Sequence, residues 1–200
     1  TSDVCRNQKV KMLEVIPNGG SYHARNRGLE YASGEFIIFF DADVQVQPHW
    51  LEKALKAMED TDYLAGNVCI ETHPEMDSAS WFEFFNAFPV KRYLELEHYG
   101  VTAGLMVRRK VIEQLGGFDQ RLRSGGDNRF GKKVHEAGLR QMFLEKPDIL
   151  HPARDFEEYL EKTRRIVKGA AAIDALYHSN KIKPSVFIRV LRLLWGLLPP

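Results

Sequence analysis

Apolar residues along this chain fall into short runs that alternate with amphipathic stretches. Residues 36–40 (FIIFF) are apolar at every position, and the run consists of aromatic and β-branched side chains. Such a run is typical of a strand that is buried on both faces. Further strands are expected at 9–16, 63–70, 102–107, 140–145 and 148–151.

Helical periodicity and helix-terminus residues separate these strands. Ser21 is expected to cap a helix that runs to about Ala32, and Pro48 to begin a second helix that ends near Asp60. Helices are also expected at 108–115, 127–137 and 155–178. The alternation of strands and helices, without internal repeats or a long linker, predicts a single α/β domain.

Two segments are unusually rich in apolar side chains. Residues 81–96 contain six aromatic residues, which core packing explains, with an acceptor groove or a membrane-facing surface as alternatives. Residues 184–199 are apolar with interspersed arginines, and they are shorter than the roughly 20 residues that span a bilayer. We expect them to form a helix that lies on the membrane surface or packs on the domain or on a partner subunit.

Composition narrows the possible function classes. Hydrophobic residues make up 44% and charged residues 28% of the chain, as in ordinary globular proteins. The net charge of +1 gives no field that attracts nucleic acid, so none is expected as a partner. Cys5 and Cys69 form no disulfide framework, and no secretory signal is visible, which predicts a reducing, cytoplasmic location. Because no initiator Met is present, we expect a piece of a longer polypeptide.

Two carboxylates, Asp41 and Asp43, directly follow the apolar run. Burying two like charges at a strand end is costly unless a cation lies between them. Mg²⁺ and Mn²⁺ are the natural candidates, because hard cations bind carboxylate oxygens and keep positions open for phosphate. The alternative is a pair of solvated loop residues that cap the next helix. The preceding strand favours the metal, because ligand sites in open α/β sheets lie at the carboxyl ends of strands.

Other polar and glycine positions have both a structural and a functional interpretation. Arg25 and Asn26 lie either on a solvated helix face or reach over the sheet edge toward a phosphate or a carboxylate. Asp127 follows two glycines, and it either caps a helix or has a functional role as a carboxylate. Gly104 lies inside an expected strand, where it allows close approach of the backbone.

Six blocks of the chain, taken in order, resemble motifs of the family-2 glycosyltransferases, which have the GT-A fold. The blocks are 24–28 (ARNRG), 34–43 (GEFIIFFDAD), 102–109 (TAGLMVRR), 115–119 (LGGFD), 125–127 (GGD) and 151–154 (HPAR). Several matches in the family's order are far more specific than any single one. The resemblance implies a mixed, Rossmann-like GT-A sheet flanked by helices within 1–155. Residues 156–200 are then a C-terminal helical extension, whose apolar stretch 184–199 is the candidate for contact with the cytoplasmic face of a membrane.

The resemblance also implies an activity. It is the inverting, metal-dependent transfer of a sugar from a nucleotide diphosphate sugar to a hydroxyl of a saccharide or lipid-linked acceptor. In that scheme Asp43 binds Mn²⁺ or Mg²⁺, and Asp41 lies on the ribose side of the donor or reaches the metal through water. Asp127 is the general base, and His151 is either a further metal ligand or a structural residue. The candidate donor contacts are Arg25, Asn26, Gly104 and Trp50.

The chain departs from the family at its start. The family begins with a strand, a helix and a second strand, and nothing before Lys9 supplies them. The fold is therefore expected to be truncated, without the base-binding half of the donor site, and strand 9–16 either pairs with 36–40 or leaves that edge open. Two rival interpretations are an inert fragment or degenerate relative, and a D-x-D phosphatase. Gln45 stands where those phosphatases need Thr or Val.

Overall fold

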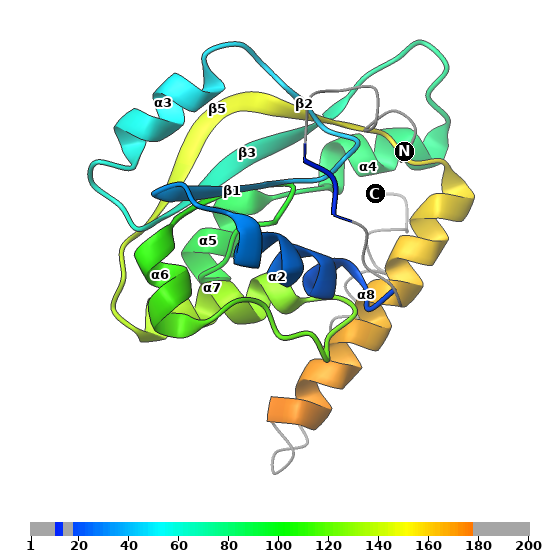
Figure 1. Cartoon of the computed structure of the whole chain (residues 1–200). Helices are drawn as coiled ribbons and strands as arrows, with labels where there is room; N and C mark the ends of the chain where they lie inside the picture. The colour runs from blue at the N-terminus through cyan, green and yellow to red at the C-terminus, as the bar shows by residue number, and fades with distance from the viewer. Residues whose placement is uncertain (1–10, 14–17, 178–200) are drawn as a thin grey trace.

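The computed structural model describes residues 11–13 and 18–177 (Figure 1). Its centre is a five-stranded sheet in the order β1-β4-β3-β5-β2. The strands are β1 (Phe36–Phe40), β2 (Gln45–Val46), β3 (Tyr63–Glu71), β4 (Gly104–Arg108) and β5 (Gln141–Pro152). β3 and β5 run parallel and the other neighbouring strands antiparallel, so the sheet is mixed, as expected.

Helices lie on both sides of this sheet. They are α2 (Ser21–Tyr31), α3 (Trp50–Ala57), α4 (Ser78–Asn86), α5 (Val90–Glu97), α6 (Arg109–Leu115), α7 (Gly126–Glu136) and α8 (Phe156–Tyr177). In Figure 1, α3 lies on one side of the sheet, and α2, α5, α6 and α7 lie on the other. The expectation of a mixed sheet flanked by helices is confirmed.

Two hydrophobic clusters attach these helices to opposite faces of the sheet. Successive strand residues point to opposite faces, so Leu105 and Val107 join the cluster with α2, α5, α6 and α7. Met106, between them, joins the cluster with α3. The same alternation along β1 puts Ile37 and Phe39 in the first cluster. Burial on both faces is the reason why the strand sequences are apolar at nearly every position.

The two short strands expected around Pro147 are one continuous strand, β5. It pairs with β3 at Gly66↔Leu144 and again at Val68↔Ile149, so residues 145–148 lie opposite Asn67 alone. Asn67 Nδ2 donates a hydrogen bond to the Glu145 carbonyl within this irregularity. Pro147 has no N–H for the ladder, and the irregularity places it where no pairing is required.

Three predicted helix starts are shifted in the structure, and one of them is α3, which begins at Trp50 rather than at Pro48. Ser21 is the first residue of α2 rather than its cap, and Gly20 occupies the capping position with a φ of 92°. Gly20 N–H donates to Asn18 Oδ1 at 2.9 Å, so an asparagine side chain orders this entry. Asp127 likewise lies in the first turn of α7, and Gly125 occupies the cap with a φ of 79°. A left-handed cap favours glycine over residues that carry a Cβ.

The strand expected at 9–16 was predicted either to pair with β1 or to leave that sheet edge open. Lys11, Met12 and Leu13 adopt no strand, and the other residues of that stretch lie outside the described residues. Among the residues that the structure describes, β1 pairs with β4 alone. The described part of the chain therefore leaves one flank of β1 without a strand.

The long helix α8 packs along the core. Ala172, Ile173 and Tyr177 contact the cluster on the α7 side of the sheet. A Cβ at Gly169 would lie 2.6 Å from the Ser124 Cβ, so α8 approaches the loop before α7 closely. The division between 1–155 and 156–200 stays a prediction. Within residues 11–13 and 18–177, no helix is long and apolar enough to cross a membrane, and the expected surface helix at 184–199 lies outside them.

Candidate functional site

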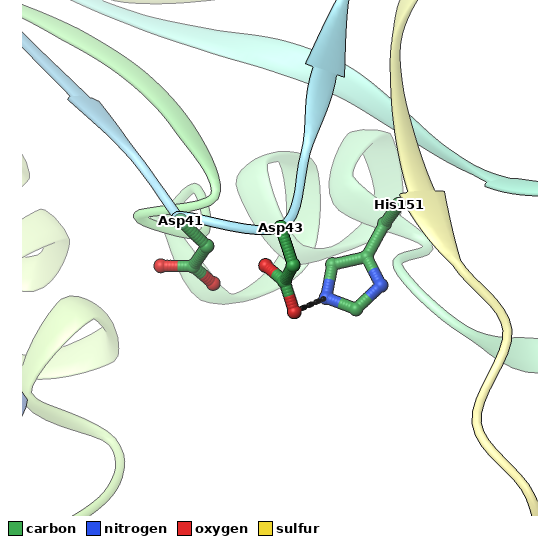
Figure 2. A group of neighbouring side chains, drawn as sticks. All are labelled: Asp41, Asp43 and His151. Carbon is green, nitrogen blue, oxygen red and sulfur yellow. Dashed lines mark ion pairs between the residues drawn. The ribbon is translucent and has the colours of Figure 1, made fainter. Parts of the chain in front are cut away.

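The sheet topology brings Asp41 and Asp43 next to His151. β1 ends at Phe40, and the chain turns through Asp41 and Asp43 into β2. β2 pairs antiparallel with β5 through Gln45↔Leu150, so the turn lies beside the end of β5 that carries His151. Figure 2 shows the three side chains pointing toward one another from these two segments. Residues more than 100 positions apart in the sequence thus form one group.

The spacing of this group is close to that of the ligands of a divalent cation. Each residue offers one ligand atom, and these atoms lie within 4.8 Å of one another. Octahedral ligands at about 2.1 Å from Mg²⁺ lie about 3 Å apart when adjacent and about 4 Å apart when opposite. His151 Nε2 lies 3.6 Å from Asp43 Oδ2, and Asp43 is 54% exposed, so the group opens to solvent. Two carboxylates and an imidazole are a donor set that Mn²⁺ accepts readily.

The neighbours of His151 fix its tautomer. Nδ1 lies 2.7 Å from the Pro152 carbonyl, which can only accept a hydrogen bond, so Nδ1 carries a proton. Nε2 lies 2.9 Å from Arg154 Nη2, which can only donate, so Nε2 carries a lone pair. The imidazole is therefore neutral, with its lone pair on the nitrogen nearest Asp43. Metal-binding histidines are oriented in this way by a partner on the other nitrogen.

Arg25 reaches Asp41 from helix α2. Its Nη2 donates to Asp41 Oδ1 at 2.6 Å, and its side chain is 18% exposed. This is the reach over the sheet edge toward a carboxylate that the sequence predicted as one of two alternatives. The guanidinium also lies 5.7 Å from the centre of the Tyr22 ring, one turn earlier on the same helix.

Asp127 is a partly buried carboxylate at the start of α7. Tyr22 Oη donates to Asp127 Oδ1 at 3.2 Å, and the Asn128 N–H donates to the same oxygen at 2.9 Å. Burial raises the pKa of Asp127 above its ordinary value. The two hydrogen bonds and the charge of Arg25 oppose this rise without cancelling it. A carboxylate whose pKa is raised is suited to accept a proton.

The two glycines before Asp127 have separate structural reasons. Gly125 has a left-handed φ of 79°, and a Cβ there would also lie 2.6 Å from Ile173 Cδ1 of α8. A Cβ at Gly126 would lie 2.8–2.9 Å from atoms of the Tyr22 ring. The absence of side chains at both positions therefore lets Tyr22 and α8 pack against the start of α7.

Asn26 and Gly104 lie in structural settings. The Asn26 amide donates to the Phe118 carbonyl at 2.7 Å and accepts from the Phe118 N–H at 2.9 Å, so it holds the 116–118 turn. Gly104 is buried in β4, and a Cβ there would lie 2.4 Å from Ile149 Cδ1. Trp50 is 2% exposed and packs in the core. Contacts of these residues with a donor stay predictions.

The comparison with protein families decides which family this is. The family model of glycosyl transferase family 2 matches residues 2–116, more than half of the chain. The chain belongs to glycosyl transferase family 2. The matched region includes the Asp41–Asp43 pair and the Arg25 helix.

Curated relatives of this family-2 glycosyltransferase cover nearly all of its length. Glycosyltransferase AglE of Haloferax volcanii is 34% identical over 90% of this chain and 59% of its own length. The pre-mycofactocin glycosyltransferase of Mycobacterium tuberculosis is 26% identical over 94% of this chain and 42% of its own length. The chain thus spans about half the length of the curated relatives that it matches.

Solved structures share the fold of this family-2 glycosyltransferase. The mannosyltransferase PcManGT from Pyrobaculum calidifontis, in complex with GDP-Man and Mn²⁺, aligns with a TM-score of 0.60. The alignment has 20% identity and covers 96% of this chain and 53% of that chain. S. aureus TarS in complex with UDP-GlcNAc aligns with a TM-score of 0.56 at 17% identity, covering 91% of this chain and 62% of that chain. The expected GT-A fold is confirmed.

Sequence reasoning missed four residues around the site of this family-2 glycosyltransferase. They are Tyr22, Glu83, Arg154 and Lys162. Tyr22 is 6% exposed and looks like a core residue in the sequence, so nothing distinguishes it. Glu83 offered a signal, because a lone carboxylate among aromatic residues on a helix needs a buried partner. Arg154 lies within the 151–154 block that carries the family resemblance, where only its histidine was considered.

Proposed function

We propose that this family-2 glycosyltransferase transfers a hexosyl group from a nucleotide diphosphate sugar to an acceptor hydroxyl, with a divalent cation and with inversion. The convergence of Asp41, Asp43 and His151 carries the proposal. Arg25 supports it, because it binds Asp41 and its charge acts on Asp127, so the proposed metal and base sites are neighbours. Fold relatives that hold GDP-Man with Mn²⁺ and UDP-GlcNAc make a nucleotide sugar the expected donor.

Asp43, His151 and Asp41 would hold the cation, with Asp43 and His151 as direct ligands and Asp41 direct or through water. Bound Mn²⁺ or Mg²⁺ offsets the charge that develops on the leaving diphosphate. The Nδ1–H tautomer of His151, fixed by the Pro152 carbonyl, presents the lone pair of Nε2 to this position. Arg25, Asn26 and Gly104 remain the candidate donor contacts.

Asp127 would act as the general base. Its carboxylate accepts the proton of the acceptor hydroxyl as the acceptor oxygen forms a bond to the anomeric carbon. The bond from that carbon to the diphosphate oxygen breaks, and the nucleoside diphosphate leaves with the electron pair. A single displacement of this kind inverts the anomeric configuration. The raised pKa of Asp127, caused by burial, makes its carboxylate a stronger proton acceptor than an exposed aspartate.

The acceptor and the location belong to the same proposal. We expect a saccharide or lipid-linked acceptor at the cytoplasmic face of a membrane, with residues 184–200 in peripheral contact with lipid. Liposome flotation of the chain with and without residues 184–200 tests the contact. Loss of flotation on truncation supports it, and equal flotation of both forms excludes it.

Asp43→Asn tests the metal assignment. Asparagine keeps the shape of the side chain and removes the charge, so Mn²⁺-dependent binding of GDP-Man and UDP-GlcNAc should be lost in calorimetry. The melting temperature in metal-free buffer should hardly change, because Asp43 is 54% exposed. Asp60→Asn, at an exposed aspartate at the end of the α3 segment, is the matched control and should bind like the parent.

Other outcomes of the same titration decide against the proposal. Undiminished Mn²⁺-dependent donor binding by Asp43→Asn would refute the assignment of Asp43. Failure of the parent protein to bind any nucleotide sugar would favour the inert relative. Binding of a phosphate analogue such as a fluoride complex, in place of a nucleotide sugar, would favour the phosphatase.

A further inference from the structure

Glu83 is the centre of a buried charge network next to the proposed metal site. Its side chain is 1% exposed on α4. Glu83 Oε2 accepts from the Arg154 backbone N–H at 2.9 Å, and Oε1 accepts from Arg154 Nη1 at 2.8 Å. Lys162 Nζ, from α8, donates to the same Oε1 at 2.5 Å. The carboxylate therefore fixes both the backbone and one arm of Arg154.

The second arm of Arg154 lies on the proposed metal ligand. Nη2 donates to His151 Nε2 at 2.9 Å, while Nη1 remains on Glu83. An imidazole nitrogen has one lone pair in the ring plane, and it either accepts a hydrogen bond or binds a cation. Arg154 and a metal ion therefore exclude each other at Nε2, whatever the identity of the ion.

The charges around the site add to this exclusion. Arg25 contacts Asp41 and Arg154 contacts His151, so two of the three candidate ligands each contact a guanidinium. A divalent cation placed among them meets two fixed positive charges. Arg154 cannot move far away, because Glu83 holds its backbone N–H and its Nη1. Its freed Nη2 then needs a new acceptor close to the metal.

We propose that Arg154 competes with the divalent cation for His151, and that the diphosphate of the donor ends this competition by accepting the displaced guanidinium. Cation and nucleoside diphosphate then bind as a cooperative pair, and Glu83 is the positioning residue that holds Arg154 where both states are reachable. The inference rests on the proposed use of a nucleotide diphosphate sugar.

Mn²⁺ binding to the full chain, followed by electron paramagnetic resonance, tests the competition directly. Arg154→Met keeps an unbranched apolar stem and removes every side-chain donor, so Mn²⁺ alone should bind about fivefold to tenfold more tightly. That factor is the size expected for the net contribution of one competing hydrogen bond. Saturating UDP or GDP should increase the Mn²⁺ affinity of the parent protein by about tenfold or more, after correction for Mn²⁺–nucleotide complexes in solution. In Arg154→Met this increase should shrink to about twofold.

Two further variants separate competition from general disturbance of the network. Lys162→Met also removes a partner of Glu83 but does not touch His151, so its Mn²⁺ affinity without nucleotide should stay within about twofold of the parent. In a His151→Ala background, Arg154→Met should bring a clearly smaller gain in Mn²⁺ affinity than in the parent, because the contested lone pair is gone and only the charge of Arg154 is removed. Arg154→Lys keeps a positive charge next to Glu83 but lacks the two-armed guanidinium that contacts Glu83 and His151 together. It replaces Arg154→Met if that variant fails to fold.

The outcomes distinguish this inference from the proposed function. Unchanged or weaker Mn²⁺ binding by folded Arg154→Met or Arg154→Lys, in a parent protein that binds Mn²⁺ and nucleotide, overturns the competition alone. A gain of equal size in Lys162→Met also overturns it. A parent protein that binds no Mn²⁺ with or without UDP or GDP overturns both proposals.

Discussion

Replacing Glu83 with glutamine leaves two cations in a buried place without their counter-charge. Glu83 is 1% exposed, whereas Arg154 and Lys162 are 19% and 18% exposed, so neither cation is freely solvated. Removing one member of a buried ion pair costs about 3–5 kcal/mol of stability. Glutamine retains one acceptor oxygen, and both cations keep some solvent contact, so we expect a smaller cost, about 2–3 kcal/mol. For a domain of this size that corresponds to a fall of about 5–10 °C in melting temperature.

The pH dependence of this loss identifies its cause. Burial alone would raise the pKa of Glu83, but the hydrogen bond and charge of Lys162 and the N–H groups of Arg154 hold it below the ordinary value of 4.5. A group with a lowered pKa in the folded state contributes its full stability above the unfolded pKa. It loses that contribution as the pH falls through the folded pKa. The difference between parent and Glu83→Gln should therefore be constant above about pH 5.5 and shrink below pH 4.5.

Urea unfolding of both proteins between pH 7 and pH 3.5 measures the difference. Glu161→Gln, at an exposed glutamate on the same α8 helix that carries Lys162, is the matched control and should change stability by less than about 0.5 kcal/mol. A difference below about 1 kcal/mol at pH 7 would contradict a buried, charge-bearing network. A difference that persists undiminished at pH 3.5 would show that packing rather than charge is responsible.

Three further predictions concern the proposed base and the packing at two glycines. Tyr22→Phe removes a hydroxyl that donates to Asp127, so the pKa of Asp127 should rise further. The acid limb of the plot of kcat/KM against pH should then move to higher pH. An acid limb that stays in place would show that Tyr22 does not tune the base. Asp127→Asn should lower kcat by a factor of about 10² or more and leave the donor affinity unchanged. An unaltered kcat would show that the role of Asp127 is structural. Gly104→Ala should cost about 1–3 kcal/mol, because its Cβ would lie 2.4 Å from Ile149 Cδ1. Gly28→Ala should instead stabilise the protein by about 0.5–1 kcal/mol, because Gly28 lies in a helix and a Cβ there would meet nothing within 4 Å. Unfolding midpoints that rank the two variants in the opposite order would refute this packing argument.

The sequence predicts much of the sheet because burial on both faces leaves a simple pattern. A strand such as Phe36–Phe40 belongs to two hydrophobic clusters at once, so it is apolar at every position and easy to find. Two of the proposed metal ligands could be predicted for a related reason, because a strand that ends in Asp41 and Asp43 places carboxylates at a sheet edge. Pairing between β2 and β5, which brings His151 there, depends on tertiary contacts that no local pattern encodes.

Other features could not be predicted from the sequence, because the local sequence around them fits more than one structure. Pro147 marks a break in strand pairing, but the sequence does not tell whether the chain ends a strand or passes through an irregularity and continues. Asn26 lies in a motif that suggests a ligand contact, yet both ends of its amide hold the backbone of Phe118. Glu83, Arg154 and Lys162 come from three separate segments, and only their meeting in space shows that they belong together.

Arg25 links the proposed metal and base sites through one positive charge. It donates to Asp41 at 2.6 Å, and the same charge lowers the pKa of Asp127, although burial keeps that pKa raised. A cation bound at Asp41 competes with Arg25 for the negative charge of the carboxylate, although Asp41, unlike Nε2 of His151, has a second oxygen to offer. If the competition turns Arg25 toward Tyr22 and Asp127, the charge near the base rises and the pKa of Asp127 falls. If it turns Arg25 toward the diphosphate, the base loses that support and its pKa rises. The pKa of Asp127 with and without Mn²⁺ therefore reports which way Arg25 moves, and the two sites are coupled in either case.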